Sequence, residues 1–189
     1  PESGLSARQW LASVSVETLE QVLRAYGDVG PARRVARRIL ERRDLGTLET
    51  TADLAQAVRE ALPFVASGSP DEIRQVFQAI RIAVNDELGA LEACLETAVN
   101  RLNPGGRIVV IAFHSGEDRI IKRVFRTYSR PRLERDPDGR TRRVWPPVLR
   151  ELTRAPLRPT PGEIADNPRS ASARIRAAER QSPREEDPS

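Results

Sequence analysis

The apolar positions in the first third of the chain recur at helical spacing. Between residues 5 and 62, large apolar side chains recur mostly at intervals of three or four positions. Ser6 and Gln9 have the spacing of a capping box, Gly27 is a natural helix stop, and Pro31 suits a first helical turn. The pattern predicts four short helices and no strand in this region.

The longest helical pattern follows a candidate linker. The segment 63–70, PFVASGSP, is rich in Pro, Gly and Ser, which indicates a linker or hinge. Beyond it, apolar residues recur at intervals of three and four from Val76 to Leu102. Asn85 is a candidate cap within this run, so the pattern predicts two helices with a break near Asn85.

The stretch 101–129 predicts a strand, a corner and an amphipathic helix. Residues 108–111, IVVI, are four consecutive β-branched residues. A strand with one wet face would alternate, so this strand is predicted to be buried on both faces, as in a parallel sheet covered by helices. Ser115 is predicted to cap the next helix, with Asp118 in the capping-box position. The apolar face of that helix consists of Ile120, Ile121, Val124, Phe125 and Tyr128.

The patterns after Ser129 are weaker. Residues 130–147 are rich in Pro, Arg and Asp, with a turn at 137–139, and they predict an exposed, mobile loop. Further short elements are predicted as a strand at 148–153, a helix at 161–165 and a strand at 172–178. Taken together, the patterns divide the chain into a helical subdomain (1–70), a second part (71–180) and a disordered tail (181–189).

Arginine dominates the charged positions. The chain carries 31 basic and 27 acidic residues, for a net charge of +4, and Lys122 is the only lysine. Six arginines lie between positions 33 and 43, outside the apolar face of the predicted helix. Such a face is either a platform for an RNA backbone or simply a solvated surface, and charge alone leaves both interpretations open.

Several classes of protein are disfavoured by what the sequence lacks. No apolar run approaches the roughly 20 residues that span a bilayer, and no signal-peptide pattern opens the chain, so we expect a soluble cytoplasmic protein. With one histidine and one cysteine, no metal site is expected. Cys94 lies on a helical pattern and is predicted to be a buried thiol. The chain contains no methionine, so we expect it to be processed or a fragment.

Three blocks of sequence carry a resemblance to a known family. Residues 113–123, FHSGEDRIIKR, resemble the FHSLEDRIVKR signature of the bacterial 16S rRNA (cytosine-N4) methyltransferases called RsmH or MraW. Residues 77–88, FQAIRIAVNDEL, and 163–169, EIADNPR, resemble two further blocks of that family. The similarity extends from Gly4 to about Arg180. Within the signature, Gly116 stands where the family usually has leucine.

The resemblance implies an α/β fold. Residues 71–180 would form the carboxyl-terminal part of a class I, Rossmann-like S-adenosylmethionine methyltransferase sheet, and residues 1–70 an inserted all-helical subdomain. The implied activity is methylation of the exocyclic amine of a cytosine in the 16S rRNA of the small ribosomal subunit, as part of a longer protein. In the family the glycine-rich cofactor loop lies upstream of the block that matches Gly4. S-adenosylmethionine is therefore expected to bind the intact protein, and residues 1–189 alone are expected to be inactive and prone to aggregate.

The resemblance also suggests site residues. His114 and Ser115 are candidate catalytic residues, as the polar wall of a methyl-transfer pocket, although the interpretation of His114 as a helix-cap neighbour that orients the corner is somewhat favoured. The candidate RNA-binding residues are Arg33, Arg34, Arg37, Arg38, Arg119, Lys122 and Arg123. The alternative function is a noncatalytic RNA-binding or assembly module that lacks a cofactor site.

Overall fold

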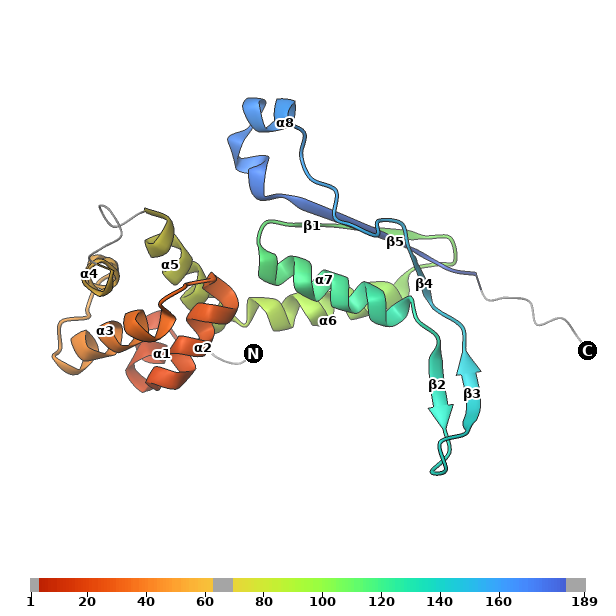
Figure 1. Ribbon diagram of the computed structural model, residues 1–189, viewed down its shortest axis with the longest axis horizontal. Coiled ribbons are helices and arrows are strands. Elements are labelled where there is room, and N and C mark those ends of the chain that lie inside the picture. The colour runs from red at the N-terminus through yellow and green to blue at the C-terminus, as the bar shows by residue number, and fades with distance from the viewer. Residues whose placement is uncertain (1–3, 63–69, 183–189) are drawn as a thin grey trace, which may run out of the picture. The chain divides into compact units, whose positions relative to one another are not determined.

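The chain folds into two compact units, each with its own hydrophobic core. Figure 1 shows the computed structural model, which describes residues 4–62 and 70–182. The division lies between Glu87 and Leu88. The predicted linker at 63–70 lies, apart from Pro70, outside the described residues, as does most of the predicted tail.

The described part of the first unit is helical, as predicted. Its helices are α1 (Ala7–Ser13), α2 (Val16–Gly27), α3 (Ala32–Asp44), α4 (Thr51–Ala61) and α5 (Pro70–Asn85). No strand occurs between residues 4 and 62. The capping box of α1 is confirmed, because the side chain of Ser6 accepts from the N–H of Gln9 and the side chain of Gln9 accepts from the N–H of Ser6.

The core of the first unit joins α5 to the earlier helices. Leu19 and Leu23 of α2, Val35 and Ile39 of α3, and Val76 of α5 are fully buried in one cluster. On α2 and on α3 the two buried residues lie four positions apart, which is the spacing that predicted these helices. Helix α5 therefore packs with the helical unit, although the sequence division had placed residues 71–85 in the second part.

The predicted break near Asn85 is confirmed. Helix α5 ends at Asn85, and α6 (Glu87–Arg101) begins two residues later. Asp86 between them has φ 48°, a left-handed conformation that interrupts a right-handed helix. Helix α6 buries Leu95 and Val99. The prediction of a buried thiol at Cys94 is wrong, because Cys94 lies on the exposed side of α6.

The second unit is built on a three-stranded antiparallel sheet. Strand β5 (Arg174–Arg180) lies between β1 (Arg107–Ala112) and β4 (Leu149–Glu151) and is antiparallel to both. The predicted strands at 148–153 and 172–178 are thus confirmed. The prediction of a parallel sheet around β1 is wrong for the described residues, because β5, the strand that pairs with β1, runs antiparallel to it.

The two faces of β1 differ in exposure. On one face, β1 packs with α6 and α7 (Ser115–Tyr128), as Figure 1 shows. The residues of this cluster include Ile108, Val110, Ala112, Leu95, Val99, Ile121, Val124 and Phe125. On the other face, Val109, Ile111 and Phe113 are 62%, 54% and 56% exposed. Burial on both faces was therefore a wrong prediction, because the described residues supply a covering layer for only one face.

The predicted mobile loop at 130–147 contains a β-hairpin instead. Strand β2 (Arg132–Arg135) pairs antiparallel with β3 (Thr141–Trp145). The predicted turn lies at its tip, where Gly139 has φ 84° and its N–H donates to the carbonyl of Asp136 at 2.8 Å. Composition suggested a loop because Pro and Asp are poor strand formers. The confirmed helix α8 (Pro161–Asp166) and the 3-10 helix η1 (Pro168–Ser172) follow.

Helices α2 and α5 approach each other closely at Gly27, so a substitution there tests the packing of the first unit. A Cβ at Gly27 would lie 2.7 Å from the carbonyl oxygen of Gln75 and 3.1 Å from Cβ of Ala79. Gly27→Ala should therefore lower the free energy of unfolding by about 1–3 kcal/mol. Gly30→Ala is the matched control, because no atom lies within 4 Å of its added Cβ. Urea denaturation followed by far-UV circular dichroism measures both, and equal midpoints would contradict the close packing.

Candidate functional site

The corner between β1 and α7 contains the residues of the signature. Strand β1 ends at Ala112, and Phe113 and His114 connect it to α7. His114 has φ −142° and ψ 167°, the extended backbone of an N-cap residue. The prediction that Ser115 caps α7 is wrong, because Ser115 is already the first residue of the helix.

His114 and Glu117 form the capping box of α7. The N–H of Glu117 donates to Nδ1 of His114 at 3.3 Å. In return, Oε2 of Glu117 accepts from the N–H of Phe113 at 2.8 Å and from the N–H of His114 at 3.3 Å. The contact with the His114 side chain and these two N–H groups hold the pKa of the Glu117 carboxyl below its usual range. The box satisfies three backbone donors at the start of the helix.

The cap limits what the His114 side chain can do. A neutral imidazole has one acceptor and one donor nitrogen, so an accepting Nδ1 places the proton on Nε2. Nε2 lies 3.2 Å from Oε1 of Glu117, which allows electrostatic attraction but not hydrogen-bond geometry. The arrangement orients the corner. A catalytic role for His114 and Ser115 stays a prediction.

Gly116 makes room for this arrangement. A Cβ at Gly116 would lie 3.1 Å from Nδ1 and 3.2 Å from Cε1 of His114. With glycine at this position, the imidazole can lie over the first turn of α7. A leucine there, which is usual in the family that the signature resembles, would have to displace the imidazole.

Asp118 connects α7 to the central strand of the sheet. Its Oδ1 accepts from Nε of Arg176 at 2.6 Å and its Oδ2 from Nη2 at 3.2 Å. Nη1 of Arg174 lies 4.0 Å from Oδ2. The hydrogen bonds from Arg176 lower the pKa of the Asp118 carboxyl. Asp118 was predicted as the capping-box partner, and the structure gives it this ion pair instead.

The four predicted RNA-binding arginines of α3 come together. Arg33, Arg34, Arg37 and Arg38 line one cavity of about 510 Å³ with Glu41, Glu60 and Ala61. Nε of Arg33 lies 3.9 Å from a carboxylate oxygen of Glu20. Among the described residues, Arg34 and Arg37 have no ion pair and both are exposed. These two guanidinium groups are thus available to an anion.

Arg38 differs from its neighbours on α3. It donates to Glu60 at 2.7 Å and to Glu41 at 3.1 Å, and these hydrogen bonds, with Glu41 the larger cause, raise its pKa. Arg42 also donates to Glu60, at 2.9 Å. The carboxylate of Glu60 therefore holds two arginines of α3 against α4, and both serve the packing of the helices.

The predicted cations of α7 lie on its exposed face. Arg119, Lys122 and Arg123 are all exposed. Nη2 of Arg123 pairs with Glu92 of α6 at 2.5 Å. For the parts of the chain that the structure describes, no helix is long and apolar enough to cross a membrane, and no three His, Cys, Asp or Glu side chains are grouped to hold a metal ion.

Comparison with known families decides the relationship of this chain. The model of the MraW methylase family matches residues 1–181. The chain belongs to the MraW methylase family. The match includes both units, and so the corner of α7 and the arginines of α3.

Curated relatives that the chain matches are named "Ribosomal RNA small subunit methyltransferase H". The relative from Rubrobacter xylanophilus is 47% identical in an alignment of 189 positions, which covers 94% of this chain and 56% of the relative. The relative from Hydrogenovibrio crunogenus is 45% identical, covering 95% and 57%, and that from Burkholderia thailandensis is 43% identical, covering 97% and 59%. The chain spans a little more than half the length of these relatives.

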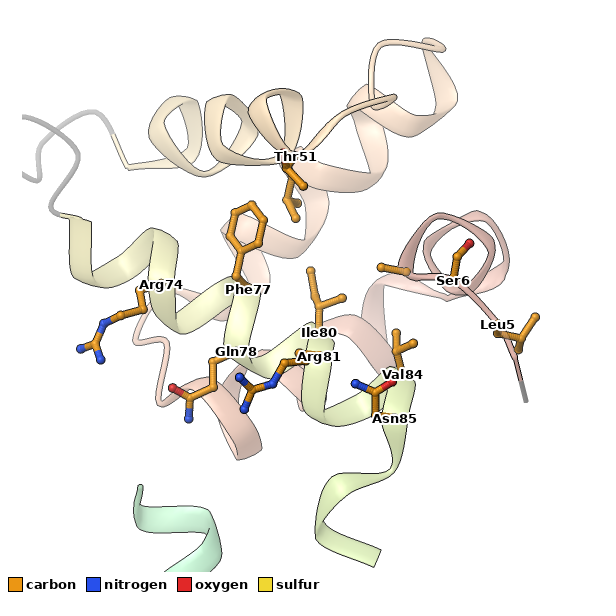
Figure 2. A pocket seen from close by; sticks show the side chains of 12 residues that line it. Leu5, Ser6, Thr51, Arg74, Phe77, Gln78, Ile80, Arg81, Val84 and Asn85 are labelled. Carbon is orange, nitrogen blue, oxygen red and sulfur yellow. The ribbon is translucent and has the colours of Figure 1, made fainter. Parts of the chain in front are cut away.

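The MraW-like block at 77–88 lines a second cavity, to which sequence reasoning assigned no role. The cavity has a volume of about 730 Å³ and lies between α1, α4 and α5. Figure 2 shows Phe77, Ile80 and Val84 of α5 pointing toward α4 and α1, whereas Arg74 and Arg81 project from another side of α5. The resemblance singled out this segment of the sequence. The cavity itself depends on the packing of three helices, which the spacing of apolar residues does not predict.

The ion pair between Asp118 and Arg176 should contribute strongly to stability. Arg176 is 4% exposed, so Asp118→Asn leaves a buried guanidinium without its carboxylate. We expect the free energy of unfolding to fall by about 3 kcal/mol at pH 7. Arg174→Gln is the control, because Arg174 lies 4.0 Å from the same carboxylate and is more exposed, and its expected cost is about 0–1 kcal/mol. Urea denaturation measures both variants.

The same ion pair should make the free energy of unfolding depend on pH in the acid range. The folded pKa of Asp118 is depressed, so its contribution is complete above the usual aspartate pKa of about 3.9 and is lost as the pH falls through the folded value. Below about pH 4, the free energy of unfolding should fall more steeply in the wild type than in Asp118→Asn. Parallel curves for the two proteins would show that Asp118 does not titrate as described.

Proposed function

We propose that this chain is part of an enzyme that methylates the exocyclic amine of a cytosine in 16S rRNA of the small ribosomal subunit. The observation that carries this proposal is the match of 94–97% of the chain to relatives called ribosomal RNA small subunit methyltransferase H. The choice of cytosine, and of S-adenosylmethionine as methyl donor, is supported by the resemblance of FHSGEDRIIKR to the family signature. Bacterial ribosomes are assembled in the cytoplasm, which is the proposed location.

The described residues do not fit the cofactor loop of a class I methyltransferase. Such a loop is glycine-rich and follows a strand, whereas Gly105 and Gly106 precede β1. Their N–H groups are also engaged: Gly105 donates to the carbonyl of Arg180 at 2.9 Å and Gly106 to that of Asn103 at 2.8 Å. We assign the binding of S-adenosylmethionine to parts of the enzyme outside the described residues. When bound, this cofactor supplies the methyl group.

The exposed face and free edge of β1 support a larger sheet in the intact enzyme. Strand β1 is at the edge of the described sheet, and three large apolar side chains lie on its open face. Exposed edges with apolar side chains are usually covered in stable proteins. We therefore propose that β1 belongs to a doubly wound, Rossmann-like sheet, with residues of the first unit as its inserted helical subdomain.

The proposed contribution of the corner is positional. The exocyclic amine of cytosine is a poor nucleophile because its lone pair is delocalised into the ring, so the base must be held precisely. His114 and Ser115 would form a polar wall beside the base. Nδ1 of His114 already accepts a hydrogen bond from the N–H of Glu117, so Nε2 is the nitrogen of this side chain that would hydrogen-bond to the base.

A second candidate function is a noncatalytic RNA-binding or assembly module. It is favoured by one observation: α3 and α7 carry exposed cations, whereas in the described ranges no strand is followed by a glycine-rich loop. The genomic sequence upstream of Pro1 distinguishes the two functions. An in-frame strand followed by a glycine-rich loop supports the enzyme, and a stop codon immediately upstream supports the module.

The unpaired arginines of α3 are expected to bind RNA phosphates. Replacing Arg34 and Arg37 together by Gln should weaken binding of a short single-stranded RNA and lower the slope of log K against log salt by about 1.4, or about 0.7 per phosphate contact. Arg8→Gln with Arg24→Gln is the control, because it removes the same charge from α1 and α2, where both arginines are ion-paired. Equal slopes for the two double variants would exclude a phosphate role for this face.

The assignment of the cofactor site is tested on residues 1–189 directly. Titration calorimetry should show no binding of S-adenosylmethionine, and a methyl-transfer assay on immature small ribosomal subunits should show no product. The full-length relative from Rubrobacter xylanophilus serves as the positive control. Micromolar binding by residues 1–189 would mean that the corner of α7 builds a cofactor site.

A further inference from the structure

The β2–β3 hairpin is rich in arginine. Residues 130–145 include six arginines against three acidic residues, so the segment has a net charge of plus three. Two of the acidic residues face arginines of the hairpin: Asp138 lies 3.3 Å from Arg140, and Glu134 lies 4.0 Å from Arg142. For Arg130, Arg132 and Arg143 the described residues supply no carboxylate partner.

Two of these arginines gather around one aromatic ring. Arg132 pairs directly across the hairpin with Trp145, and Arg143 lies two residues before Trp145 on the same strand face. The guanidinium carbon of each arginine lies 5.1 Å from the centre of the indole ring. The result is a surface in which an aromatic ring and two planar cations adjoin.

A cavity lies at the base of the hairpin. It has a volume of about 640 Å³, which lies in the range of small-molecule sites in proteins. Its lining combines two aromatic rings, Tyr128 and Trp145, with two cations, Arg130 and Arg132, for which the described residues supply no carboxylate partner. The other lining residues are Asn100, Thr127, Pro131, Pro146 and Val148. An amide and a hydroxyl group are thus present beside the rings and the cations.

We propose that the hairpin and this cavity bind single-stranded RNA, with one unstacked nucleotide held in the cavity. A nucleotide combines a planar aromatic base with an anionic phosphate, and the lining offers aromatic faces for the base and guanidinium groups for the phosphate. Asn100 and Thr127 supply hydrogen-bonding groups for a base edge. The surface favours a single strand over a duplex, because in a duplex the faces of each base are already stacked on the neighbouring base pairs. This inference rests on the proposed function, from which RNA follows as the partner.

The test separates stacking from charge. Binding of a short, labelled single-stranded RNA to residues 1–189 is measured by fluorescence anisotropy at several salt concentrations. Trp145→Ala should weaken binding at least fivefold with an unchanged salt slope, and Trp145→Phe, which keeps an aromatic ring, should retain most of the affinity. Arg132→Gln with Arg143→Gln should lower the slope by about 1.4.

The control is Arg154→Gln with Arg158→Gln, which removes the same charge from exposed positions of the second unit outside the hairpin. If the hairpin variants bind single-stranded RNA as tightly as this control, the hairpin proposal is overturned while RNA binding elsewhere stands. Equal affinity of Trp145→Ala and the wild type overturns the stacked nucleotide. Equal losses on single-stranded and fully duplex RNA also overturn it. If the wild type binds no RNA at low salt, RNA contact by this chain fails as a whole, and with it the RNA part of the proposed function.

Discussion

The buried guanidinium of Arg176 is the constraint on which the geometry of the second unit depends. Arginine does not lose its charge at any accessible pH, so a side chain that is 4% exposed requires a carboxylate from a neighbouring element. Asp118 meets this need from the first turn of α7. The pair holds that turn against the central strand β5, and the same orientation directs the apolar side of α7 to the sheet. Glu117 is then left to satisfy the N–H groups of the corner.

The helical part of the fold could be predicted from the sequence, and the sheet only in part. Periodicity is local, so the helices between residues 5 and 62 and the break at Asn85 followed from it. The direction of the strand beside β1 was not predictable, because a β-branched run is compatible with several neighbours. Ser115 seemed the better cap since hydroxyls are common N-caps, but in the structure His114 is the cap with Glu117 as its partner, and Asp118 pairs with Arg176, 58 positions away.

The roles of the individual arginines also depend on packing and could not be predicted from composition. In the sequence, the basic residues of α3 formed one undifferentiated face. In the structure, Arg38 and Arg42 share Glu60, and Arg43 donates to the carbonyls of Leu11 and Val14. Arg34 and Arg37 remain exposed without an ion pair among the described residues. Likewise, the contact of Arg132 with Trp145 requires the register of a hairpin that the composition of residues 130–147 did not indicate.

The strand order of the second unit has a consequence for how it is made. Strand β5 lies in the middle of the sheet but is the last of the described strands in sequence order, and β1 and β4 each pair with β5 and not with one another. Arg107, the first residue of β1, meets Glu179, 72 positions later. During synthesis, β1 therefore cannot form its pairing with β5 until β5 has left the ribosome. A chain that stops before Arg174 has lost the centre of its sheet, and no two of the remaining strands of that sheet would adjoin.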